Sequence, residues 1–244
     1  STLLFSRENI RGSASKLTAQ GFNNESLGFN NMGIGEIATV GSGAYEENSL
    51  AYMARVNYTY KSRYLLTATV RKDGYSGFGR GNKWATFPSI SLGWVPSEEA
   101  FLKDKGLYLK VRTSYGVNGN QGIGRYSSLS SMGTTYYIYG SNTAIGLFPE
   151  TLGNPDLSWE ETTSFNAGID FGIWSNRITG SINAYDAKTK NVLVRRQLPP
   201  AAGYPNIWAN IGGLANKGLE LELNTVNIDG AEFSWKSNFV FSIN

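Results

Sequence analysis

In the stretch Arg55–Gly74, RVNYTYKSRYLLTATVRKDG, apolar residues occupy every second position on both sides of a two-residue break at Lys61-Ser62. A side-chain period of two predicts β-strands, and a break this short predicts a hairpin turn. A soluble sheet buries its apolar face, whereas a membrane barrel turns that face to lipid and lines its lumen with the polar face. The alternation therefore predicts the strands but leaves the surroundings of each face open.

Nine segments carry this alternation, and most of them are ten to twelve residues long. Strands of soluble proteins are typically about five or six residues long, whereas about 9–11 tilted residues cross a bilayer. The segments are 1–10, which is weak, 51–60, 63–73, 84–94, 107–118, 160–171, 177–188, 215–225 and 232–243. A further hairpin around TTYYIYG, at 134–140, would add to this count.

The connections between these segments alternate between long and short. In an up-and-down antiparallel sheet every second connection lies at the same end, so the long ones share one rim. One end then carries 11–50, 74–83, 119–159 and 189–214, and the other carries 61–62, 95–106, 172–176 and 226–231. Long loops at one rim and short turns at the other are typical of outer-membrane barrels. Within 95–106, Ser97 before two glutamates predicts an N-cap and one or two helical turns.

The composition excludes several kinds of active site. The chain has no Cys and no His, which removes thiolate and imidazole metal ligands and the usual general base. Its net charge of +3 is spread along 244 residues, so no basic tract indicates a nucleic-acid partner. It has no apolar run long enough for a membrane-spanning helix. We therefore predict an all-β chain that is not an enzyme and holds no cofactor.

Charged residues gather on the polar face of the predicted strands, which makes them candidates for the lumen of a barrel. They are Arg55, Arg71, Lys110, Arg112, Asp170, Glu220, Glu222 and Lys236. Some would pair with neighbouring carboxylates, and others would contact a substrate. The opposite face is predicted to contact lipid through Ile90, Leu92, Val111, Ile169 and Leu221.

Aromatic residues lie near the short connections. They are Tyr58, Tyr60, Tyr64, Trp94, Phe171, Trp174, Phe233 and Trp235. Tyr and Trp favour the membrane–water interface, where the ring meets lipid and the polar atom meets water. The core aromatics of a soluble sandwich have no reason to gather at one end, so this distribution favours a membrane barrel. A soluble carbohydrate-binding β-sandwich module is the alternative.

Two loop motifs suggest chemistry but fit structural roles better. DGYSGFGRGN (73–82) lacks the Lys-Ser/Thr pair and the helix of a phosphate-binding loop, so we expect a flexible surface loop. NPDLSWEE (154–161) suggests a glycosidase, but Glu160 and Glu161 are adjacent and would point to opposite faces of a strand. Loop aromatics could stack on sugar rings or peptide side chains, or could pack the loops together or against a partner. They are Tyr126, Tyr136, Tyr137, Tyr139 and Trp208.

Several segments, in one order, carry a more specific signal. They are RVNYTYKSRYLLTATVRKDG, GNKWATFPSISLGWVPSEEAFLKD, LKVRTSYGVNGNQGIG, LGNPDLSWEETTSFNAGIDFGIWSNRITGSINAYDAKTKNVLV and LPPAAGYPNIWANIGGLANKGLELEL. From Arg55 to its end, the chain closely resembles the SusC/RagA-like TonB-dependent transporters of Bacteroidota outer membranes. The resemblance implies a multi-pass outer-membrane protein with a transmembrane antiparallel up-and-down β-barrel of 22 strands and an N-terminal plug.

The same resemblance implies import of glycan or peptide fragments with three kinds of partner. They are a SusD/RagB-like surface lipoprotein, the TonB complex and outer-membrane lipid. No plug, TonB box or leading domain is recognisable, so we expect residues 1–244 to form the C-terminal part of one barrel domain. An odd number of strands with two open edges predicts that this segment does not close into a stable barrel by itself.

Overall fold

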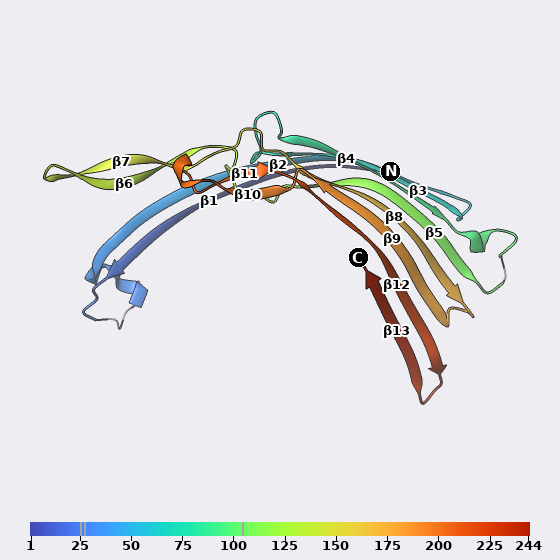
Figure 1. The fold of residues 1–244 in the computed structure, drawn as a ribbon. Helices are drawn as coiled ribbons and strands as arrows, with labels where there is room; N and C mark the ends of the chain where they lie inside the picture. The colour runs from blue at the N-terminus through green and yellow to red at the C-terminus, as the bar shows by residue number, and fades with distance from the viewer. Residues whose placement is uncertain (25, 27, 104) are drawn as a thin grey trace.

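The computed structural model describes residues 1–24, 26, 28–103 and 105–244. One antiparallel sheet of nine strands dominates the fold and curves like an arch (Figure 1). In the order of their pairing, the strands are β1 (Thr2–Gln20), β2 (Glu36–Tyr60), β3 (Tyr64–Tyr75), β4 (Trp84–Trp94), β5 (Tyr108–Asn120), β8 (Glu160–Ile173), β9 (Ile178–Lys190), β12 (Gly213–Asp229) and β13 (Ser234–Ile243). All nine predicted segments overlap these strands, so the predicted meander is confirmed.

The predicted loop at 11–50 is wrong. β1 continues to Gln20 and β2 begins at Glu36, and the two strands pair over this extension with one bulge at Thr18/Ala19. The short 3₁₀ segment η1 (Gly28–Ile34) lies in the connection between them. The extension is rich in Gly, Ser and charged residues and is largely exposed. A strand pair that is exposed on both faces needs no apolar face, so it lacks the alternation that identified the other strands.

Two small hairpins are inserted in the long connections. The one expected around TTYYIYG is confirmed as β6 (Ser131–Tyr139) and β7 (Asn142–Thr151), and it projects away from the arch (Figure 1). The other, β10 (Leu193–Gln197) and β11 (Asn206–Asn210), joins through η3 (Pro200–Ala202) and was not predicted. Its strands are only five residues long, too short for a periodicity to stand out.

The connection between β4 and β5 begins with η2 (Pro96–Glu98), a 3₁₀ turn of three residues. The prediction that Ser97 is its N-cap is wrong. Val95 occupies the cap position, because proline at the first helical position holds the preceding residue outside the helix. The Ser97 hydroxyl instead donates to the Leu109 carbonyl at 3.2 Å, which ties this turn to the start of β5.

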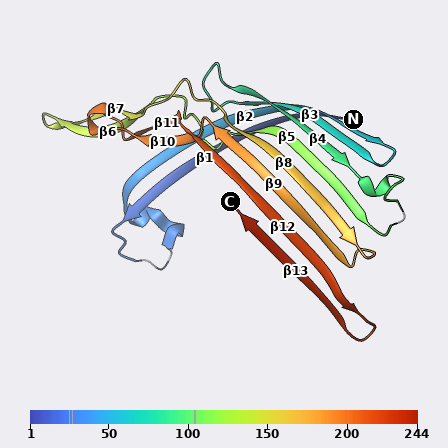
Figure 2. The same ribbon diagram turned by 45° about the vertical axis from the view of Figure 1, so that its right-hand side comes forward.

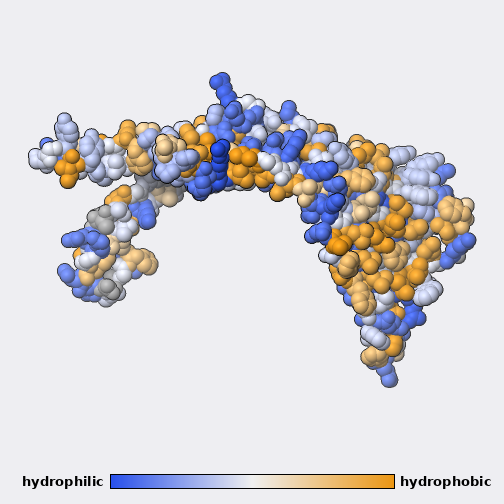
Figure 3. Space-filling model, in the orientation of Figure 1, coloured by the Kyte–Doolittle hydropathy of each residue, from blue (hydrophilic) through white to orange (hydrophobic). Residues whose placement is uncertain are grey.

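The strand register separates two faces of the sheet. Directly paired residues in an antiparallel sheet point to the same side. One row of paired residues runs Trp94, Val111, Ile169, Ile182, Leu221 and Phe241, and the next runs Gly93, Arg112, Gly168, Asn183, Glu220 and Ser242. We call the side of Val111 the apolar face and the side of Arg112 the polar face. Figure 3 shows apolar residues gathered over β8, β9 and β12.

The sheet is open. Within the described residues β1 pairs only with β2, and β13 pairs only with β12, so each edge strand offers one unpaired side. Figure 2 shows β8, β9, β12 and β13 side by side, with β13 at the free edge. None of the helical segments that the structure describes is long and apolar enough to cross a membrane.

Candidate functional site

The most buried part of the molecule lies where the long connections meet. Phe78 and Leu157 are 1% and 0% exposed, and they form a cluster with Tyr75, Phe87, Ile123 and Trp159. The rings of Phe78 and Trp159 are 5.0 Å apart, and those of Phe87 and Trp159 are 5.4 Å apart. We call these six residues the loop core. Four of them come from the two motifs that suggested chemistry, Tyr75 and Phe78 from 73–82 and Leu157 and Trp159 from 154–161, so both motifs have structural roles here.

Backbone contact holds the two motifs together. The Gly79 amide donates to the Leu157 carbonyl at 2.9 Å, and the Trp159 indole donates to the Lys83 carbonyl at 3.1 Å. A Cβ at Gly79 would stand 1.7 Å from the Pro155 carbonyl oxygen, so no other residue allows this approach. The Gly-rich segment therefore packs tightly against 154–159, so the expectation of a flexible surface loop is wrong.

The β10–β11 hairpin is fastened to the same segment by hydrogen bonds. The Asn154 side-chain amide donates to the Trp208 carbonyl at 2.9 Å, and the Ser158 backbone amide donates to the Asn210 side-chain oxygen at 2.8 Å. The Leu193 amide donates to a Glu160 carboxylate oxygen at 2.8 Å. Trp208 also packs against the loop core. The hairpin therefore presents Trp208 from a fixed platform.

The two adjacent glutamates are engaged in separate structural contacts. Glu160 accepts from the Leu193 amide and from Asn120, whereas Glu161 forms an ion pair with Lys190 at 2.9 Å. Successive residues of a strand point to opposite faces, so the two carboxylates do not converge on one substrate. This arrangement does not make the carboxylate pair that a glycosidase requires.

The connection from β5 to β6 is fastened to β2. The Tyr126 hydroxyl donates to the Glu46 carbonyl at 3.0 Å and accepts from the Glu46 amide at 2.8 Å. The Arg125 guanidinium forms an ion pair with Glu47 at 2.8 Å and lies 4.0 Å from the centre of the Tyr45 ring. These contacts fix a second wall opposite the hairpin.

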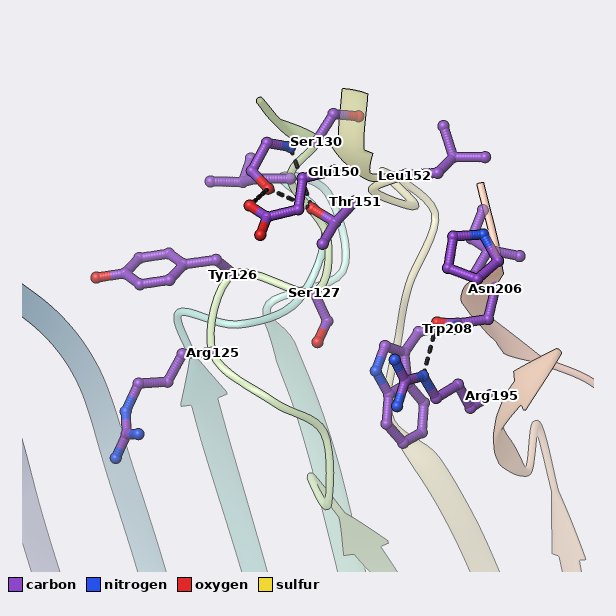
Figure 4. A pocket seen from close by; sticks show the side chains of 14 residues that line it. Arg125, Tyr126, Ser127, Ser130, Glu150, Thr151, Leu152, Arg195, Asn206 and Trp208 are labelled. Atoms are coloured by element: carbon purple, nitrogen blue, oxygen red, sulfur yellow. Dashed lines mark hydrogen bonds between the residues drawn. The ribbon is translucent and has the colours of Figure 1, made fainter. Parts of the chain in front are cut away.

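A pocket of about 510 Å³ lies between these two walls (Figure 4). Tyr126 and Trp208, two of the predicted loop aromatics, line it from opposite walls, and Arg195 lies beside Trp208. Arg195 donates to Asn206 at 2.6 Å, which leaves its terminal nitrogens available. Glu150 lines the pocket with the opposite charge. The pocket thus offers two aromatic side chains and charges of both signs.

The other three predicted loop aromatics are not in this pocket. Tyr136, Tyr137 and Tyr139 lie on β6, on the projecting hairpin, where they are 73%, 47% and 76% exposed. Sequence reasoning also missed Arg195 and Glu150. They lie in segments without a recognised motif, and only tertiary packing brings the two segments together.

The eight predicted lumen residues all lie on the polar face by strand register. Arg112 pairs with Asp170 at 3.1 Å and donates to the Asn183 side chain at 2.5 Å. Gly168 lies between them, and a Cβ there would stand 3.0 Å from the Arg112 guanidinium carbon. Because Gly168 has no side chain, the Arg112 side chain can cross over β8 and reach Asn183 on β9.

The other charged residues of the polar face make local contacts. Arg71 pairs with Asp73 at 2.8 Å, and Arg55 donates to Thr69 at 3.1 Å. Glu222 accepts from Asn224 at 3.0 Å. Lys110 lies beside Asp170, Glu220 beside Asn183, and Lys236 beside Val226 in the register. Which of them contact a substrate stays a prediction.

A family model described as "TonB dependent receptor-like, beta-barrel" matches residues 7–244. The chain belongs to this family. The TonB-dependent receptor P39 of Formosa agariphila is 39% identical over 233 residues, covering 94% of this chain and 22% of that receptor. The TonB-dependent receptor SusC of Bacteroides thetaiotaomicron is 38% identical over 198 residues, covering 78% of this chain and 20% of SusC. This TonB-dependent receptor chain thus spans about a fifth of these relatives' length.

Solved structures agree with this assignment. The RagAB peptide importer in its closed-closed state matches with a TM-score of 0.85 at 26% identity, covering 98% of this chain and 27% of that chain. The siderophore receptor PirA from Pseudomonas aeruginosa shares the fold alone, with a TM-score of 0.53 at 16% identity, covering 98% of this chain and 43% of that chain. The resemblance to SusC/RagA-like receptors is confirmed, and the soluble β-sandwich alternative is not supported.

TonB-dependent receptors of this type lie in the outer membrane, so the apolar face of this receptor chain is expected to be the one that contacts lipid. Its five predicted lipid-facing residues all lie there by register. Ile90, Leu92 and Ile169 are 46%, 49% and 42% exposed. An apolar surface this continuous is expected only where another apolar phase covers it.

The predicted interface aromatics of this receptor chain lie at the short-turn end. At this end the Glu99 carboxylate accepts hydrogen bonds from two of them, the Tyr64 hydroxyl at 2.6 Å and the Trp94 indole at 3.3 Å. It also accepts one from the Arg63 guanidinium at 2.7 Å. The hydrogen bond from Tyr64, with those from Trp94 and Arg63, lowers the pKa of the Glu99 carboxyl. The rings of Tyr64 and Trp94 stay exposed while their polar atoms reach the rim, as is typical of residues at a membrane–water interface. The remaining members near short connections are Tyr58, Tyr60, Phe171, Trp174, Phe233 and Trp235.

Proposed function

We propose that this chain forms barrel wall and surface loops of a SusC/RagA-type importer for glycan or peptide fragments. The observation that carries the proposal is the register, which sets a charged face and an exposed apolar face on opposite sides of one meander. A lumen for polar nutrients and a lipid-facing outer surface need this separation. The similarity to SusC and to the RagAB peptide importer supports the same function.

The whole importer is proposed to contain more than this segment. Both sheet edges are unpaired, and unpaired backbone groups in lipid cost several kcal/mol each. We infer that further strands continue the sheet into a larger barrel around a plug, which the TonB complex opens. A SusD/RagB-like lipoprotein covers the loop rim and delivers the substrate. The protein moves its substrate without chemical change and so is not an enzyme.

The pocket between the β10–β11 hairpin and the β5–β6 connection is proposed to contribute to substrate capture at the loop rim. Ligand sites combine aromatic walls with a few placed polar groups on a preformed scaffold. Trp208 meets this description best, because the hairpin that carries it is fastened by hydrogen bonds and rests on the loop core. Aromatic faces suit sugar rings and peptide side chains alike, so the pocket fits both substrate classes.

Replacing Trp208 by alanine in the full-length receptor is expected to lower its affinity for substrate about tenfold, the order of a well-packed aromatic anchor. The measurement is uptake of labelled oligosaccharides and peptides by cells that express the receptor. Tyr139→Ala is the matched control, because it removes an aromatic ring from the projecting hairpin outside the pocket. An equal loss of substrate uptake in the two variants, at equal receptor abundance, would contradict a role for the pocket.

The orientation of the barrel gives a second expected result. Residues 119–159 and 189–214, and the connection at 21–35, should face the cell exterior, while Lys61-Ser62 and 172–176 should face the periplasm. An epitope tag in the β6–β7 turn, at Gly140-Ser141, should bind antibody on intact cells. A tag at Lys61-Ser62 should bind antibody only after the outer membrane is permeabilised. Binding at Lys61-Ser62 on intact cells would refute this topology.

A further inference from the structure

The apolar face changes in character toward the loop rim on β1, β2 and β3. Three successive register rows show the change: Leu3, Ala54 and Val70; then Phe5, Tyr52 and Lys72; then Arg7, Leu50 and Gly74. The first row is wholly apolar, the second combines two aromatic rings with a lysine, and the third adds an arginine. This succession places two cations directly above lipid-facing side chains.

The second row is part of an aromatic cluster. Phe5 and Tyr52 have ring centres 5.2 Å apart, Tyr52 and Trp84 stack at 6.1 Å, and the Lys72 ammonium lies 5.6 Å from the Trp84 ring. A Cβ at Gly74 would stand 2.9 Å from the Trp84 ring, so the glycine allows the indole to lie flat across β3. Exposed aromatic rings capped by a lysine are typical of a membrane–water interface.

The position of this cluster fits the outer edge of the lipid layer. Tyr52 lies eight residues before Tyr60, which is at the opposite, short-turn rim. Eight residues span ~26 Å along a strand, or ~20 Å along the membrane normal for a strand tilted by ~40°. An apolar band ~25 Å tall separates the two aromatic girdles of outer-membrane barrels. The cluster therefore lies near the outer boundary of the apolar band, close to the lipid headgroups.

A groove of about 520 Å³ runs beside the cluster, and its lining includes Leu3, Phe5, Ala54, Val70 and Lys72. The groove is mostly apolar, with the lysine at the end nearest the loop rim. Among the residues that the structure describes, neither Arg7 nor Lys72 has a carboxylate within ion-pair distance, whereas Arg11 is paired with Glu46. These two cations above an apolar groove are therefore available to an anionic group from outside the chain.

We propose that this surface binds a phosphate-bearing lipid of the outer leaflet, with an acyl chain in the groove and the phosphate between Arg7 and Lys72. Arginine binds phosphate in a bidentate manner, and lysine adds a point charge. The groove lies within the lipid-facing band, where a membrane lipid has direct access and a soluble anion does not. The site is separate from the loop pocket and from the polar face.

The test uses the full-length receptor in nonionic detergent, with bound lipid counted by native mass spectrometry. The probes are phosphorylated lipid A, the same lipid A after removal of its phosphates, and inorganic phosphate. Wild-type receptor should retain the phosphorylated lipid most strongly. Arg7→Gln/Lys72→Gln should weaken its retention about 30-fold, since each cation near a charged lipid surface contributes about fivefold.

Two further variants make the result specific. Lys61→Gln removes a lysine that also lies over an aromatic ring, at 5.2 Å from Tyr60, but at the opposite rim, so retention should not change. Ala54→Trp fills the groove and leaves both cations, so it should weaken retention even if the double variant fails to fold. The proposal is overturned if Lys61→Gln loses as much lipid as the double variant, if Ala54→Trp binds like wild type, or if inorganic phosphate displaces the lipid.

Discussion

Replacing Phe78 by alanine is expected to destabilise the loop rim of this receptor by about 3–5 kcal/mol, the usual cost of truncating a buried phenylalanine. Phe78 is 1% exposed and packs against the rings of Tyr75 and Trp159. The cavity that the alanine leaves would loosen the contact between the Gly-rich segment and 154–159. Because Trp208 rests on the same loop core, its platform should loosen as well.

Limited proteolysis of the full-length receptor in membranes should detect this change. Cleavage within 74–83 and 154–159 should become much faster, while the barrel strands stay protected. Phe29→Ala is the matched control, because Phe29 is 84% exposed and its removal should cost less than about 0.5 kcal/mol. Cleavage of Phe78→Ala at the wild-type rate would show that the loop core does not hold the rim.

The second large effect concerns the apolar face. Ile169→Arg places a charge among Val111 and Ile182, and a cation near the bilayer midplane of a barrel costs about 2–4 kcal/mol. Asn166→Arg introduces an arginine on the polar face of the same strand, where water is available, and should lower the free energy of unfolding much less. Urea unfolding of the full-length receptor in lipid vesicles measures the loss of stability in each variant. Similar losses for the two variants would contradict the assignment of the faces.

Sequence alternation predicted most of the sheet because lipid and lumen impose different residues on successive positions. It worked for β3, β5, β8 and β12, where apolar residues recur at every second position. It failed for the outer parts of β1 and β2, since a pair of strands exposed on both faces carries no such contrast. It also missed β10 and β11, whose pairing depends on a scaffold built from distant segments.

The candidate site was predictable only in part. Tyr126 and Trp208 stood out as loop aromatics, but nothing in the sequence groups them or separates them from Tyr136 and Tyr139. Their grouping depends on contacts between distant residues, such as the Tyr126 hydroxyl on the backbone of Glu46, 80 residues away. Arg195 becomes a candidate only through its position beside Trp208.

Single cysteines at Val111 and Arg112 test most directly whether these strands form the wall of a membrane barrel. The two residues are adjacent on β5 and point to opposite faces, and this chain has no cysteine of its own to add background labelling. In the full-length receptor in membranes, a lipid-soluble thiol probe should label position 111, and a water-soluble probe should label position 112. Swapped labelling, or equal labelling of both positions by the water-soluble probe, would contradict the membrane-wall assignment.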